Sequence, residues 1–245
     1  FYNNGSNIGT AGDYFEIGFA SAARCALVDN GLNALLRSDE FDNASWTKTR
    51  SSISANSLAA PDGTVTADTL IEDTSTNTHF VTQAVTVSSS AADYCFGVAV
   101  KASGRNWIQL VLNETAGGGN LFGYFNSSTG AIGTLSAGSN WANVRAFSRD
   151  LGNGWWAFYL VGRKTNAATT INAQIYLASA DNVNSYTGTS SGLFVWRATM
   201  AQSSVTTRLI QTTSAATSGT SQTGAALYLK GLLASTNGLL VADDL

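Results

Sequence analysis

The sequence predicts an all-β protein that folds as an antiparallel sandwich or barrel. Apolar and polar residues alternate with a period of two in many short runs, for example over residues 94–101. Gly and Asn interrupt these runs at intervals of roughly 10–15 residues, a spacing typical of sandwiches and barrels. No long amphipathic helix is evident anywhere in the chain.

The expected strands follow one another from residue 78 onward. The first places His79, Val81, Gln83, Val85 and Val87 on one face. The remaining strands repeat the same alternation, so their apolar faces are expected to share one core. The expected strands cover residues 78–87, 94–101, 108–112, 121–125, 141–147, 155–161, 171–177 and 193–200.

Turn residues lie between these strands. Gly152-Asn153-Gly154 carries the Asn-Gly signal of a tight hairpin, because both central residues tolerate positive φ. It is expected to join a strand that ends near Arg149 to one that begins at Trp155. Ser127-Ser128-Thr129-Gly130 predicts a second turn, and Pro61-Asp62-Gly63 contains the only proline of the chain.

Three regions are expected along the chain. Residues 1–34 are rich in Gly, Asn and Ala and are interpreted as an arm for attachment or oligomer contact. Residues 35–210 form the sandwich. Residues 211–245 comprise a low-complexity linker and an apolar tail, which cannot form a core alone and is expected to dock on another subunit or on the main domain.

Composition narrows the possible functions. Of the 245 residues, 44% are hydrophobic and only 12% are charged, with a net charge of −3. Ser, Thr, Asn and Gly take the place of charged residues. The resulting hydroxyl-rich, weakly charged surface suits an extracellular or virion protein that packs among copies of itself. The scattered Lys and Arg residues argue against nucleic-acid binding, and no apolar run is long enough for membrane insertion.

The two cysteines, Cys25 and Cys95, form neither a disulfide framework nor a metal-binding motif. Two alternatives remain open for them. They either serve as small apolar residues or form a single bridge in an exported protein. Phe1 is either a processed end or simply the start of the recorded sequence.

Several short sequence blocks follow one another along the chain in a characteristic order. They begin with Asn33-Ala34-Leu35-Leu36-Arg37-Ser38-Asp39-Glu40-Phe41-Asp42 and the nearby Trp46. Ala60-Pro61-Asp62-Gly63-Thr64 follows, and His79 and Gln83 then fall on a strand. The Gly152-Asn153-Gly154-Trp155 hairpin and Val195-Trp196-Arg197-Ala198-Thr199-Met200 complete the set.

In this order the blocks resemble a family of jelly-roll domains, like carbohydrate-binding modules, that recurs in structural proteins of tailed bacteriophages, such as head fibres, decoration proteins and tail proteins. The resemblance covers about residues 24–213. It implies a jelly-roll sandwich located in a virion, with copies of itself and capsid or tail proteins as partners. The resemblance implies no catalytic residue in this chain. The family's last block usually carries a Gly-Ala-Gln-Leu-Glu-like run, which is replaced here by Arg197-Ala198-Thr199-Met200-Ala201.

Aromatic side chains are the candidate glycan-binding residues, because the apolar face of a sugar ring packs on a π surface. Trp155 and Trp156 are adjacent on a strand and must point to opposite faces. One is expected in the core, and the other either contacts a glycan or packs on a neighbouring subunit. Trp46 and Trp196 are expected to be core anchors. The full candidate set is Trp107, Trp141, Trp155, Trp156 and Tyr124.

The titratable residues give weaker signals. The only histidine, His79, lacks the partners that a general base or metal ligand needs, so a structural or surface role is expected. Glu72-Asp73 and the acids near residue 40 offer carboxylate pairs, but nothing shows that they face one another. No cofactor is expected. The alternative is a structural Ca²⁺ held by Asp39, Glu40 or Asp62.

Three functions therefore remain. The favoured one is a non-enzymatic virion structural protein of a tailed phage, exposing its jelly roll as a capsid decoration or fibre-like protein. The alternative is a glycan-binding module for host or surface attachment. The third, a glycosidase or depolymerase, requires a cleft with two facing carboxylates, and the chain lacks the helical repeat of the longer β-helical enzymes.

Overall fold

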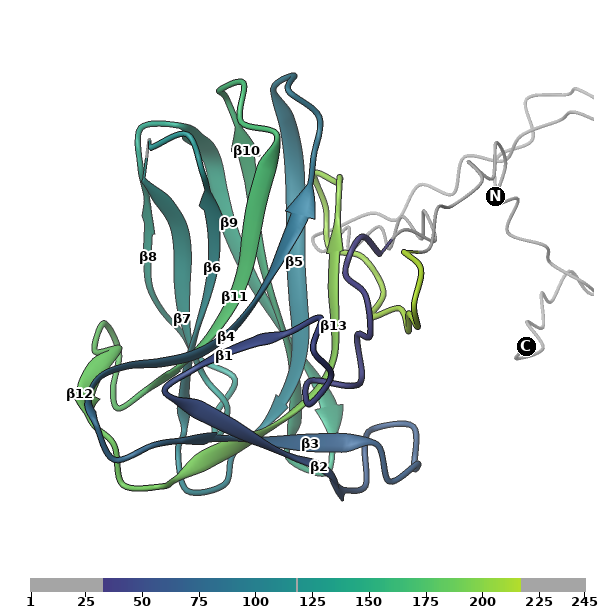
Figure 1. The fold of residues 1–245 in the computed structure, drawn as a ribbon, viewed down its shortest axis with the longest axis vertical. Coiled ribbons are helices and arrows are strands. Elements are labelled where there is room, and N and C mark those ends of the chain that lie inside the picture. The colour runs from purple at the N-terminus through teal and green to yellow at the C-terminus, as the bar shows by residue number, and fades with distance from the viewer. Residues whose placement is uncertain (1–32, 118, 217–245) are drawn as a thin grey trace, which may run out of the picture.

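The protein is an antiparallel β-sandwich, which confirms the predicted all-β jelly-roll class (Figure 1). The computed structural model describes residues 33–117 and 119–216. Most of the expected N-terminal arm and of the linker and tail lies outside the described residues, as does Cys25. The described part of the chain contains no helix, and therefore none that is long and apolar enough to cross a membrane.

Two sheets pack face to face (Figure 1). The seven-stranded sheet has the order β1 (Thr47–Thr49), β4 (Thr76–Thr86), β11 (Thr170–Ala178), β6 (Trp107–Glu114), β7 (Asn120–Asn126) and β8 (Ile132–Ala137), with β12 (Ser185–Thr187) also paired to β4. The six-stranded sheet has the order β2 (Ser51–Leu58), β3 (Ala67–Glu72), β13 (Gly192–Ala201), β5 (Ala92–Lys101), β10 (Trp155–Lys164) and β9 (Trp141–Gly152).

The main core lies between the sheets and follows the predicted alternation. On β5 the side chains of Phe96, Val98 and Val100 are fully buried there. Val81 and Val85 of β4 meet them from the other sheet. Each large apolar side chain removed from water in this way contributes about 1.5–3 kcal/mol.

The predicted Asn-Gly hairpin is confirmed. Trp155 pairs with Gly152 across the β9–β10 ladder, so Asn153 and Gly154 form a two-residue loop. Their φ angles are 53° and 78°. Positive φ at both central positions matches the right-handed twist of the flanking strands, which explains why this dipeptide specifies the turn.

A second apolar layer covers the outer face of the six-stranded sheet. Trp155, Trp196 and Ala99 are buried there against Ala60 and Ala67 from the β2–β3 region. A neighbouring cluster buries Cys95, Ala157, Tyr159 and Val161, with Leu209 packed against it. Burial raises the pKa of the Cys95 thiol to about 11. On the outer face of the seven-stranded sheet, β4 and β11 carry exposed and half-buried side chains such as Thr82, Ala84 and Asn172.

One buried amide joins the entering chain to the leaving chain. The Asn33 side chain is inaccessible to solvent. Its Nδ2 donates to the carbonyl oxygens of Ala198 at 2.9 Å and Ile210 at 2.7 Å. Its Oδ1 accepts from the backbone N–H groups of Leu35 at 3.1 Å and Met200 at 3.0 Å. The Asn33 side chain therefore binds backbone groups of three separate segments of the chain.

Further bonds extend this junction. Ala34 N–H donates to the Met200 carbonyl at 2.8 Å. The Thr212 N–H donates to Ser38 Oγ at 2.8 Å, and Thr212 Oγ1 donates to the Leu35 carbonyl at 2.7 Å. We call these contacts among residues 33–38, 198–200 and 210–213 the entry–exit junction, because the chain enters and leaves the sandwich there. It holds residues 34–36 against the rest of the sandwich.

Replacing Asn33 is expected to destabilise the domain strongly. In Asn33→Asp the shape is kept, but an oxygen replaces the donor that faces two carbonyl oxygens. An unsatisfied buried polar group costs about 1–3 kcal/mol, so we expect a loss of about 3 kcal/mol or more in the free energy of unfolding. Urea unfolding measures it, with Asn120→Ala on the exposed start of β7 as the control. A change below about 0.5 kcal/mol in Asn33→Asp would contradict the role of the junction.

Candidate functional site

The outer face of the seven-stranded sheet carries a continuous row of side chains along β4 and β11. Phe80 pairs with Tyr176, Thr82 with Gln174, and Ala84 with Asn172. These residues alternate with the buried His79, Val81, Gln83 and Val85, so they point away from the core. The same period-two pattern that fills the core therefore also sets the composition of this surface.

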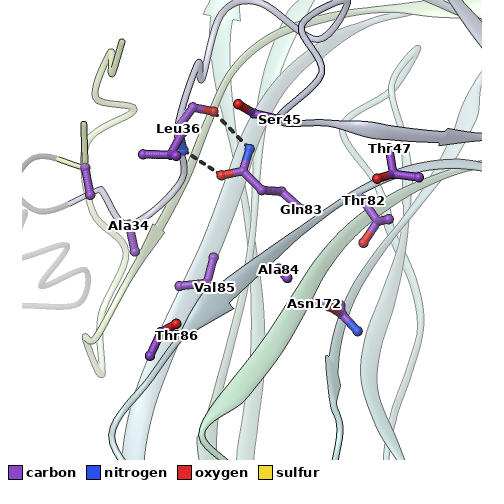
Figure 2. A pocket seen from close by; sticks show the side chains of 11 residues that line it. Ala34, Leu36, Ser45, Thr47, Thr82, Gln83, Ala84, Val85, Thr86 and Asn172 are labelled. Carbon is purple, nitrogen blue, oxygen red and sulfur yellow. Dashed lines mark hydrogen bonds between the residues drawn. The ribbon is translucent and has the colours of Figure 1, made fainter. Parts of the chain in front are cut away.

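An open groove of about 640 Å³ lies at one end of this row (Figure 2). Its floor is the β4–β11 pair near Ala84 and Asn172, and Thr47 of β1 lines one side. Residues 34–36 form the opposite wall. The Gln83 amide fixes that wall, because Nε2 donates to the Leu36 carbonyl at 2.9 Å and Oε1 accepts from the Leu36 N–H at 2.6 Å.

The polar lining of the groove is uncharged. Apart from the Gln83 amide, it consists of the side chains of Ser45, Thr47, Thr82, Thr86 and Asn172. Among the described residues, none of these five side chains has a hydrogen-bond partner. The Thr82 hydroxyl is buried as well as unpartnered within the described residues, which is uncommon for a polar group in a folded protein. The groove therefore offers several free donors and acceptors.

Two aromatic rings continue the row beyond the groove. Phe80 and Tyr176 stack with their centroids 4.3 Å apart and their planes 19° apart. Both are half-buried, so part of the stacked pair remains open to solvent. Burial raises the pKa of Tyr176. Its hydroxyl donates to Gln174 Oε1 at 3.5 Å.

The predicted Trp pair lies on β10, with its two rings on opposite faces of the sheet as expected. Trp155 faces outward but is only 2% exposed, beneath the second apolar layer. Trp156 points inward, packs against the main core and covers Gly130. The outward-facing ring, which was expected to contact a glycan or a neighbouring subunit, is covered instead by segments of its own chain that lie over the six-stranded sheet.

The other aromatic candidates also lie away from the groove. Trp141 and Tyr124 are buried, at 6% and 2% exposure, and burial raises the pKa of Tyr124 to about 12. Trp107 is half-buried beside Gly133. Trp46 is a core anchor as predicted, whereas Trp196 is buried in the outer layer rather than between the sheets.

The acids proposed as Ca²⁺ ligands are engaged by arginines. Arg197 lies between Asp39 and Asp62, with Nη2 at 3.2 Å and 3.4 Å from their carboxylates. Glu40 pairs with Arg37 at 3.1 Å. Within residues 33–117 and 119–216 no group of three or more His, Cys, Asp or Glu side chains is arranged to hold a metal ion.

The remaining titratable candidates are structural. His79 is completely buried, with Nδ1 2.9 Å from the Arg50 carbonyl and Nε2 3.4 Å from the Tyr186 carbonyl. The Glu72 carboxylate is also buried. It accepts from Arg105 at 2.6 Å, and the Tyr186 hydroxyl donates to it at 2.6 Å.

Sequence reasoning missed the groove residues, although a signal for them was present. Thr82, Ala84 and Thr86 occupy the polar face of the very strand whose apolar face was identified. Asn172 and Tyr176 alternate with the buried side of β11 in the same way. What the sequence could not show is that β4 and β11 are neighbours, because this pairing joins strands far apart in the chain.

Distant structural similarities to known proteins include a phage tailspike domain and a carbohydrate-binding module. The enzymatically active domain of tailspike protein 4 of bacteriophage CBA120 matches 71% of this chain at 15% identity, with a TM-score of 0.44. This chain spans only 22% of that domain. TmCBM61, solved in complex with beta-1,4-galactotriose, matches 70% of this chain and 99% of its own length, at 13% identity and a TM-score of 0.39. No protein family and no curated protein matches the sequence.

The Glu72 network predicts a specific loss of stability in acid. Burial alone would raise the pKa of Glu72, but hydrogen bonds from Arg105, Tyr186 and the Thr189 N–H outweigh burial and lower it to about 2. The stabilisation is therefore present above the usual pKa of 4.5 and is lost as the pH falls toward 2. The shift corresponds to about 3 kcal/mol.

The Glu72→Gln variant tests this predicted loss of stability in acid directly. We expect the variant to unfold about 3 kcal/mol more easily than the wild type at pH 7, and the difference to shrink steadily between pH 4.5 and pH 2. Glu40→Gln is the control, because its partly exposed ion pair is worth less than about 1 kcal/mol. A difference for Glu72→Gln that does not change with pH would contradict this account.

Proposed function

We propose that this protein is a non-catalytic glycan-binding module whose ligand lies along β4 and β11 of the seven-stranded sheet. One observation carries the proposal. A groove of about 640 Å³, lined by hydroxyl groups and the Asn172 amide, which have no hydrogen-bond partner among the described residues, adjoins a stacked aromatic pair on the same two strands.

Sugar chemistry matches both halves of this surface. A pyranose ring has an apolar C–H face that packs on aromatic rings, which Phe80 and Tyr176 supply. Its hydroxyl rim requires dense hydrogen bonding, which the side chains near Thr82 and Asn172 supply. The floor of the groove lies on the paired strands β4 and β11, so the sheet holds the floor side chains in place before binding.

The proposal is for binding without catalysis. No Asp, Glu, His or Cys lines the groove among the described residues. The buried acids Glu72 and Asp39 are each bonded to an arginine. Glycoside hydrolysis requires two carboxyl groups that flank the scissile bond. The groove offers no such pair.

The resemblance to phage structural proteins suggests where such a module works. We propose that the chain is a virion protein that exposes this face on the particle, next to copies of itself and to capsid or tail proteins. Exposed Ile132 and Leu135 on the edge strand β8 favour contact with a neighbouring chain. Cryo-electron microscopy of intact particles tests this role, and a purified chain that stays monomeric and binds no particle component would oppose it.

Removing the aromatic platform is expected to weaken glycan binding. In Tyr176→Ala and Phe80→Ala, affinity for a glycan identified on an array should fall at least tenfold, or about 1.4 kcal/mol. Isothermal titration measures the change, and thermal unfolding confirms that each variant is folded. The matched control is Phe147→Ala, because Phe147 is 39% exposed on β9 of the other sheet.

Two outcomes would contradict the proposal. One is an array on which the full chain binds no glycan above background. The other is an equal loss of affinity in Phe147→Ala and Tyr176→Ala, which would place the ligand elsewhere or show only a general loss of stability.

A further inference from the structure

We infer that the groove selects a neutral glycan whose sugars carry N-acetyl groups, with Asn172 and Thr82 as the residues that determine this specificity. The inference rests on the proposed function and narrows it from glycans in general to one chemical class. Three features of the groove carry it: its lack of charge, its unpartnered amide and hydroxyl, and the methyl-bearing side chains between them.

The absence of charge excludes acidic and basic sugars as preferred ligands. No Lys, Arg, Asp or Glu is among the described residues that line the groove. Lys48 of β1 and Arg50, which follows β1, are not among the residues that line the groove, and both donate to backbone carbonyl oxygens. Lys48 Nζ donates to the carbonyl oxygens of Asp42 and Asn43 at 2.7 Å, and Arg50 Nε donates to the Thr78 carbonyl at 2.6 Å. A carboxylate or ammonium group on the ligand would lose water without gaining a partner.

An acetamido group has the complementary hydrogen-bonding groups. It offers one N–H donor and one carbonyl acceptor. The Asn172 side chain provides both an acceptor and donors, and the Thr82 hydroxyl can act as either. Asn172 lies directly across from Ala84, and Thr82 lies two residues before Ala84 on the same face of β4. Both side chains therefore line the floor of the groove from adjacent strands.

The third feature is apolar. Ala84 is exposed on the groove floor, and its methyl group leaves room that a larger side chain would fill. Ala34 and Leu36 add apolar surface from the wall (Figure 2). A bare hexose would place a hydroxyl against these methyl groups, where it finds no partner. The methyl group of an N-acetyl substituent instead removes apolar surface from water.

Two oligosaccharides with the same backbone isolate the contribution of the N-acetyl group to binding. Cellotetraose and N-acetylchitotetraose share β-1,4 linkages and differ only in the substituent at C2. We expect the full chain to bind N-acetylchitotetraose at least tenfold more tightly in isothermal titration. De-N-acetylated chitotetraose, which is cationic, and tetragalacturonate, which is anionic, should bind more weakly than N-acetylchitotetraose by at least the same factor.

Variants connect the preference to the named residues. Asn172→Ala and Thr82→Val should each reduce the preference for the N-acetylated ligand at least threefold. Tyr176→Ala should lower the affinity for both ligands equally. Asn120→Ala, on the exposed start of β7, is the control and should change neither affinity. Thr82→Val is nearly isosteric and removes a buried unpartnered hydroxyl, so loss of folding is not expected.

The outcomes separate this inference from the function on which it rests. Equal binding of the two tetrasaccharides, or a preference that survives in Asn172→Ala, would overturn the N-acetyl assignment and leave the glycan-binding role intact. Preferred binding of a charged ligand would also overturn it. Absence of binding to every glycan tested would remove the proposed function itself.

Discussion

The hydrogen bonds of Asn33 are the constraint on which both the sandwich and its groove depend. This buried amide binds backbone groups of the entering chain, of β13 and of the segment that leaves the domain. Residue 34 follows it directly, and residues 34–36 form one wall of the groove. The polar contacts that close the fold therefore also shape the surface proposed to bind a ligand.

Gln83 completes this connection from the other sheet. It lies on β4, whose inner face also contributes Val81 and Val85 to the core and buries His79. Its amide pairs with both backbone groups of Leu36, much as a neighbouring strand would. An amide is well suited to this position because it satisfies a donor and an acceptor at once without introducing a charge. The groove wall is thus anchored at both of its ends, by Asn33 and by Gln83.

The fold class and eight of the strands could be predicted from the sequence, because alternation and the Asn-Gly turn depend on local chemistry. The expected strand over residues 78–87 appears as β4, and that over 94–101 as β5. Strands such as β2 were missed, because Ser51–Leu58 is mostly polar and exposed and so lacks an apolar alternation. The candidate site was not predictable in the same way. Burial of Trp155 depends on residues near 60 and 209, and the groove depends on the pairing of β4 with β11.

The central claim is that the ligand lies along β4 and β11 rather than on the Trp-rich six-stranded sheet. Backbone amide chemical shifts in nuclear magnetic resonance, followed during titration with a bound glycan, test it most directly. The account predicts that the largest shifts fall at Thr82, Ala84, Asn172 and Tyr176 and on the wall at Leu36. Shifts centred instead on β9, β10 and β13, with these residues unchanged, would contradict it.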